Sequence, residues 1–124
     1  MTDAAAELAR FMGGELDPAA FRHREHVGMG YEMLRRYDFA AAYHFSCGLH
    51  AMAARAGRPE ALHQTTTIAF LSLIAERLAL RDAPADFTAF ERANPDLMDK
   101  SVLAHWYRPE RLALAAARRT FLLP

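Results

Sequence analysis

The chain has 124 residues, with 15 basic and 15 acidic side chains and therefore no formal net charge. This length predicts one domain, residues 1–124, that can bury a core without disulfides or a structural metal. The balanced charge argues against nucleic acid as a partner, because phosphate binding needs a basic surplus or a basic stripe. The longest apolar stretch, 68–75, is too short to cross a bilayer, so no membrane partner is expected.

The cysteine content bears on the cellular location. Cys47 is the single cysteine, which excludes an internal disulfide and favours a reducing compartment, so the expected location is the cytoplasm. The first residues show no basic leader followed by an apolar run, so no signal peptide is expected. Cys47 has no CxxC partner and no basic neighbour in the sequence, and it is predicted to be a buried structural thiol.

Alanine, leucine, arginine and glutamate dominate the sequence, which has only two valines and two isoleucines. This composition favours helices over strands. Glycine, proline and aspartate residues divide the chain into predicted helices over 3–12, 22–37, 38–56, 59–80, 86–93 and 109–119. The predicted fold is all-α: a compact antiparallel bundle of three or four long helices, with short helices covering its ends.

The apolar pattern also predicts which helix faces are buried. The segment 59–80 has apolar residues on nearly all sides, so it is predicted to be the central and most buried helix. In the segment 38–56, one side carries Phe39, Tyr43 and Leu49, and this side is predicted to face the core.

Two histidines three residues apart, His23 and His26, stand at the start of the predicted helix 22–37. Their Cβ atoms would be about 5–6 Å apart, so both rings can reach one metal ion. The pattern is HxxH and not the HExxH of zinc proteases. A third histidine, His63, falls in the first turn of the predicted helix 59–80. An antiparallel bundle places the N-termini of these two helices at the same end, which would bring the three histidines together.

Three histidines and an open coordination position suit a transition metal ion. Glu60 and His63 form one ExxH pair, whereas di-iron bundles use two such pairs, so a mononuclear site is favoured. The predicted metal ligands are therefore His23, His26, His63 and Glu60, and the predicted cofactor is zinc or iron. The alternative is that these histidines are satisfied by hydrogen bonds within the protein, in which case no cofactor is expected.

A metal-free site could use the same residues. His26 or His63 would act as a general base, with its pKa tuned by burial and by Glu25 or Glu60, so the predicted catalytic residues are His26, His63 and Glu25. The predicted function is a small bacterial enzyme whose histidine-centred pocket acts on a small organic molecule, with the reaction class left open. The alternative is a non-catalytic helical module that binds a ligand or a partner protein.

Three segments carry a family resemblance: Phe21–Val27, Tyr107–Leu112 and Ala117–Pro124. With their patterns F-x-H-x-E-H, Y-x-P-E and A-R-x-x-F-L-L-P, the chain resembles a group of small helical bacterial proteins. The resemblance implies a bacterial source and one small domain, and it carries no activity over. Gln64 follows His63 where the group has an acidic residue, so no ligand or base is implied at that position.

The chain ends on an apolar tail, Phe121-Leu122-Leu123. Such a tail is expected to dock into the core or into a partner subunit rather than to lie in water. Because zero net charge also suits self-association, a homodimer is the expected protein partner.

Overall fold

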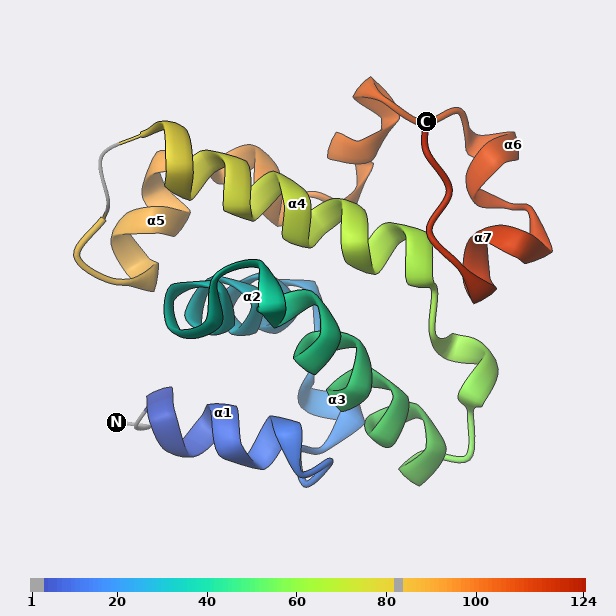
Figure 1. Cartoon of the computed structure of the whole chain (residues 1–124), viewed down its shortest axis with the longest axis horizontal. Helices are drawn as coiled ribbons and strands as arrows, with labels where there is room; N and C mark the ends of the chain where they lie inside the picture. The colour runs from blue at the N-terminus through green and yellow to red at the C-terminus, as the bar shows by residue number, and fades with distance from the viewer. Residues whose placement is uncertain (1–3, 82–83) are drawn as a thin grey trace.

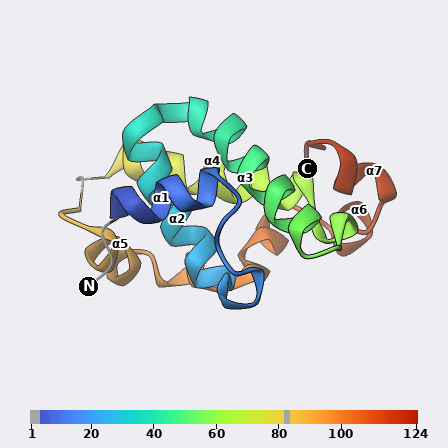
Figure 2. The same ribbon diagram turned by 90° about the horizontal axis from the view of Figure 1, so that it is seen from below.

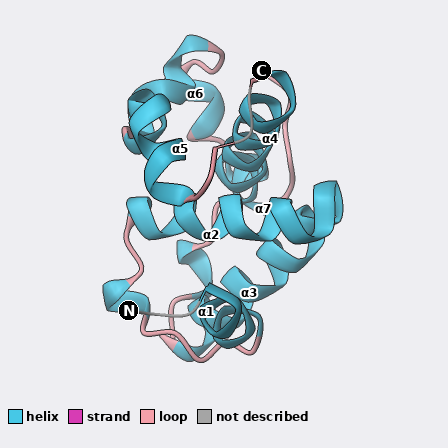
Figure 3. Cartoon of the chain, turned by 90° about the vertical axis from the view of Figure 1, so that its left-hand side faces the viewer, coloured by secondary structure: helices cyan, strands magenta, loops and turns pink. Residues whose placement is uncertain are grey.

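The computed structural model describes residues 4–81 and 84–124, which contain helices and turns but no strand (Figure 3). Three long helices form the body of the molecule (Figure 1): α2 (His23–Tyr37), α3 (Ala41–Arg55) and α4 (Gln64–Leu80). A shorter helix, α1 (Ala4–Met12), packs on α2 and α3 on the side away from α4 (Figure 2). The prediction of an all-α fold is confirmed.

Short helical segments complete the fold at both ends of α4 (Figure 1). Near its C-terminal end α5 (Phe87–Ala93) packs against α2, and near its N-terminal end lie α6 (Pro109–Leu112) and α7 (Ala115–Arg119). The remaining segments are 3-10 turns over Pro18–Ala20, Asp38–Ala40, Pro59–Ala61, Pro95–Met98 and Lys100–His105. No helix within the described residues has the length and apolar character needed to span a bilayer.

The helix at the centre of the core is α2, which contacts α1, α3, α4 and α5. Its side chains Val27, Tyr31 and Met33 are at most 1% exposed. Many apolar side chains of α4 are only half-buried, among them Ile68, Phe70 and Leu78, and Phe70 lines a cavity. The prediction that the 59–80 helix would be the most buried one is therefore wrong.

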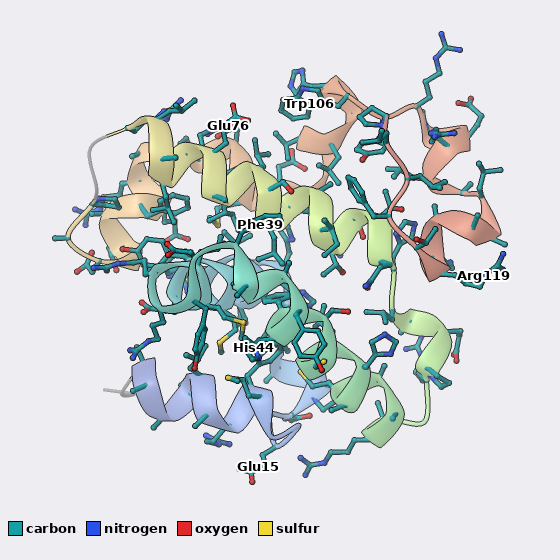
Figure 4. The ribbon with its side chains drawn as sticks, viewed as in Figure 1. Glu15, Phe39, His44, Glu76, Trp106 and Arg119 are labelled. Carbon is teal, nitrogen blue, oxygen red and sulfur yellow. The ribbon has the colours of Figure 1, made fainter. Side chains whose placement is uncertain are left out.

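The buried face of α3 differs from the predicted one. Asp38 has φ 50° and lies in a 3-10 turn, so the α-helix begins only at residue 41. Its buried row includes Phe45, whereas Phe39 and Tyr43 are 54% and 71% exposed. Phe39 is labelled in Figure 4. The predicted burial of Phe39 and Tyr43 is wrong, and so is that of Cys47, whose thiol is exposed.

A close contact between α1 and α3 depends on Gly48. A Cβ atom at this position would lie 2.5 Å from the ring of Phe11, so only glycine lets the two helices approach this closely. Phe11 in turn stacks on Phe21, with ring centroids 5.3 Å apart, and meets Phe45 at a tilt, with centroids 5.1 Å apart. This cluster positions Phe21, whose ring is 4.4 Å from that of His26.

The C-terminal tail docks on α4 of its own chain. The hydroxyl of the fully buried Thr65 donates to the Thr120 carbonyl at 2.7 Å and accepts the N–H of Leu122 at 3.0 Å. The Tyr107 hydroxyl donates to the Leu122 carbonyl at 2.7 Å. Hydrogen bonds therefore hold the tail in place, while the side chain of Leu123 is 69% exposed.

Candidate functional site

A cavity of about 670 Å³ lies between the first turns of α2 and α4 and the C-terminal half of α3. The turn Lys100–His105, α6 and α7 complete its walls. His23, His26 and His63 all line it, so the structure brings the three sequence-predicted histidines to one place. Its floor is apolar, formed by Val27, Phe45, Leu49, Met52, Phe70, Leu71 and Ile74. We call this space the histidine cavity.

His63 precedes α4 as its N-cap residue instead of lying in its first turn, because residues 59–61 form a separate 3-10 turn. Its Nδ1 accepts the backbone N–H of Thr66 at 3.2 Å, which satisfies one of the free N–H groups at the helix start. A ring nitrogen that accepts carries no proton, so Nε2 is the protonated nitrogen and donates to the Leu112 carbonyl at 2.8 Å. Both nitrogens of His63 are therefore engaged.

His23 is held by one hydrogen bond and one ring contact. Its Nε2 lies 2.8 Å from the carbonyl oxygen of Leu97, and because a carbonyl can only accept, this nitrogen carries the proton. The ring meets Phe70 edge-on, with centroids 4.7 Å apart. His23 thus links α2 to the Pro95–Met98 turn and to the wall of the cavity.

His26 lies in surroundings that disfavour the charged form of its ring. Burial lowers the pKa of its ring to about 4, and the positive charges of His23 and Lys100 act in the same direction. A hydrogen bond to the backbone of Phe21 opposes this shift without reversing it. The ring is therefore neutral at pH 7, and in the neutral form one nitrogen can donate while the other accepts.

The two predicted carboxylates lie elsewhere. Glu25 lines a second cavity of about 750 Å³ beside α1 and α5, and not the histidine cavity. The Glu60 carboxylate lies 3.8 Å from Nε of Arg58 on the surface, and the Glu60 carbonyl accepts from Arg118 at 2.9 Å. The structure therefore brings neither carboxylate to the three histidines.

This arrangement bears on the predicted metal site. Among residues 4–81 and 84–124, no group of three or more His, Cys, Asp or Glu side chains is placed to hold a metal ion. A site made of His23, His26 and His63 would require His63 to give up a hydrogen bond that caps α4 or one that holds α6. The hydrogen bonds of His23 and His63 are of the kind that the alternative of internally satisfied histidines describes, and the metal-ligand assignment remains a prediction.

Sequence reasoning missed the cations around the cavity. These are Arg22, Arg58, Lys100 and Arg118, which come from four separate segments. No local pattern links them in the sequence, because only the packing of the C-terminal half against α2 and α4 brings them to the same cavity.

The histidine cavity thus combines an apolar floor, a neutral histidine and the hydroxyl oxygens of Thr66 and Thr67. Both hydroxyls donate to the His63 carbonyl, at 3.2 and 2.8 Å, so their oxygens can still accept a hydrogen bond from a ligand.

Comparisons of the chain with models of known families, with curated proteins and with solved structures gave no match.

Proposed function

We propose that this protein binds a small organic molecule in the histidine cavity, with the neutral ring of His26 as the central polar contact. The cavity itself carries this proposal. Its volume of about 670 Å³ and its apolar floor with few polar groups are typical of small-molecule sites. The second cavity, beside α1 and α5, has a similar volume but none of the three histidines lines it.

The three histidines have different tasks in this proposal. His23 and His63 donate to backbone carbonyls and hold the Pro95–Met98 turn and α6 in place around the cavity. His26 keeps its ring in the cavity wall between Phe21 and Phe45, at centroid distances of 4.4 and 6.3 Å. It is therefore the histidine best placed to bond a ligand.

An enzymatic role would use the same ring. A base with a pKa of about 4 accepts protons weakly at neutral pH, since general-base catalysis works best when the pKa lies near the working pH. Catalysis by His26 would thus require a ligand that raises its pKa. Binding without catalysis does not require a raised pKa, so we favour binding as the proposed role.

The proposed setting is the cytoplasm of a bacterial cell. The exposed thiol of Cys47 supports this setting, because free surface thiols persist in reducing compartments. The homodimer expected from the sequence also remains a proposal, and light scattering of the purified chain tests it.

Two alanines of α3 provide a matched test. Ala53 lines the histidine cavity, whereas the adjacent Ala54 is exposed and lies outside it. Ala53→Phe should fill part of the cavity and Ala54→Phe should leave it open. We expect ligand-observed NMR with a library of neutral, anionic and cationic fragments to detect binders of the wild type and of Ala54→Phe that Ala53→Phe no longer binds.

The controls distinguish binding in the cavity from loss of the fold, from binding elsewhere on the surface and from a metal site. Circular dichroism of both variants verifies that the fold is retained. Fragments that bind all three proteins equally, or no binders at millimolar concentration, would contradict the proposal. Zinc or iron present in equimolar amount in untagged protein, and lost in His63→Ala, would support the metal-ligand prediction instead.

A further inference from the structure

The charges around the histidine cavity have one sign. Its lining includes the cations Arg22, Arg58, Lys100 and Arg118, and none of the described residues that line it is an aspartate or a glutamate. The chain as a whole has equal numbers of basic and acidic residues, so this surplus is local. All four side chains are exposed, which places their charges at the rim and leaves the apolar residues on the floor.

Most of these cations have no carboxylate partner within the described part of the chain. Arg58 has a loose ion pair with Glu60, at 3.8 Å between exposed side chains, which contributes little in water. Arg118 donates to the backbone carbonyl of Glu60, which does not neutralise its charge. No ion pair involves Arg22 or Lys100 among the described residues. Lys100 is close enough to His26 for its charge to disfavour protonation of that ring.

The backbone adds positive potential from two directions. The first turns of α2 and α4, helices of 15 and 17 residues, both line the cavity through His23, His26, Thr66 and Thr67. A helix start carries a partial positive charge from its free N–H groups. The N-cap residue of α2, Arg22, makes no side-chain hydrogen bond to these groups, and such free N–H groups at a helix start favour an anion.

The floor of the histidine cavity is apolar, in contrast to its cationic rim. α4 has more apolar surface than its contacts with other helices bury, and its half-buried Phe70 lines the cavity together with the buried Leu71 and Ile74. Phe45, Leu49 and Met52 of α3 contribute the other part of this apolar floor. A ligand that fills this space must therefore present an apolar body to the floor while a polar group meets the rim.

From the unpaired cations, the two helix starts and the apolar floor, we infer that the ligand is an amphipathic organic anion, with its charged group at the rim beside Lys100 and its apolar body against α3 and α4. This inference rests on the proposed small-molecule function and specifies the class of ligand. Charge-assisted hydrogen bonds from lysine and arginine side chains are the contacts that a carboxylate accepts most favourably.

The test uses three compounds with the same alkyl chain: octanoate, 1-octanol and octylammonium. Binding to the full chain is measured by calorimetry or by NMR titration at neutral pH. We expect octanoate to bind about tenfold more tightly than octanol, because a charge-assisted hydrogen bond contributes about that factor. Octylammonium should bind more weakly than octanol, since its charge has the same sign as the rim.

Matched variants assign the effect to the rim. Lys100→Gln should weaken octanoate binding by about tenfold and leave octanol unchanged. Arg36→Gln removes an exposed arginine of α2 outside the cavity and should change neither affinity. Both substitutions are at the surface, so the fold is retained. Ala53→Phe should abolish binding of every compound that enters the cavity.

Three results would overturn the inference in different ways. If octanol and octanoate bind equally to the wild type and both lose binding in Ala53→Phe, the cavity takes small molecules but does not select anions. The inference then fails and the proposed function stands. If none of the three compounds binds at millimolar concentration while fragments still bind the wild type and not Ala53→Phe, the inference fails and the proposed function stands. If neither the three compounds nor any fragment binds, both fail.

Discussion

At the scale of single residues, the environment of His26 disfavours protonation of its ring. Burial and nearby positive charge lower its pKa from 6.5 to about 4 in the folded protein. In the unfolded chain the ring titrates near its ordinary value. Between these two pKa values the unfolded state binds a proton that the folded state does not, so stability falls as the pH drops from 6.5 towards 4.

We therefore predict that His26→Gln loses a pH dependence that the wild type shows. The wild-type free energy of unfolding should fall by up to about 3 kcal/mol between pH 6.5 and 4 through this group. The glutamine side chain does not titrate, so the variant should keep only the dependence due to other groups. Urea denaturation at a series of pH values measures the difference. His50→Gln, at an exposed histidine of α3, is the control and should follow the wild type. Parallel curves for the wild type and His26→Gln would contradict the assignment.

At the scale of helices, the contact between α1 and α3 is set by the missing side chain at Gly48. Alanine is the better helix former by about 1 kcal/mol. In Gly48→Ala, however, the new methyl group would lie 2.5 Å from the ring of Phe11, which is fully buried and cannot move freely. Overpacking of this kind costs about 1–3 kcal/mol, so we expect a net loss of stability of about 1 kcal/mol.

Chemical denaturation of Gly48→Ala measures this loss, and a second substitution tests its cause. Phe11→Leu removes the ring that the methyl group would meet, so Gly48→Ala should cost less in that background than in the wild type. Equal costs in the two backgrounds would show that the contact with Phe11 is not the reason for glycine at this position.

The helices themselves could be predicted from the sequence, because composition, caps and breakers act locally. The buried face of α3 could not, because Phe39 lies in the 3-10 turn before the helix and the buried row of the helix contains Phe45 instead of Tyr43. The apolar surface of α4 was visible in the sequence, but a continuous apolar pattern does not distinguish a buried helix from the wall of a cavity. Which of these applies depends on the segments that pack around α4.

The candidate site, too, could be predicted only in part from the sequence. The convergence of His23, His26 and His63 followed from the order of the long helices, which a sequence can suggest. The hydrogen bonds that engage His23 and His63 could not be predicted, because their acceptors, Leu97 and Leu112, lie 74 and 49 residues away in the chain. The cations at the rim escaped prediction for the same reason.

At the scale of the whole molecule, the C-terminal tail connects stability to the cavity. Thr65 bonds both Thr120 and Leu122, and α7, which precedes the tail, supplies Arg118 to the rim. Thr65→Val keeps the shape of the side chain but removes both hydrogen bonds. It leaves the Leu122 N–H and the Thr120 carbonyl without this partner, so we expect a loss of about 1–3 kcal/mol in the free energy of unfolding.

Thr65→Val should also change the local stability of the C-terminal tail. Hydrogen exchange at the Leu122 amide should become faster in Thr65→Val, because its acceptor is the Thr65 hydroxyl. Since a loosened tail also frees α7, the affinity for octanoate should fall in the same variant. Thr66→Val removes a hydroxyl of the same helix turn that bonds only the His63 carbonyl, so Leu122 should keep its protection there. Unchanged exchange at Leu122 in Thr65→Val would mean that other contacts, such as the Tyr107 hydrogen bond, are enough to hold the tail.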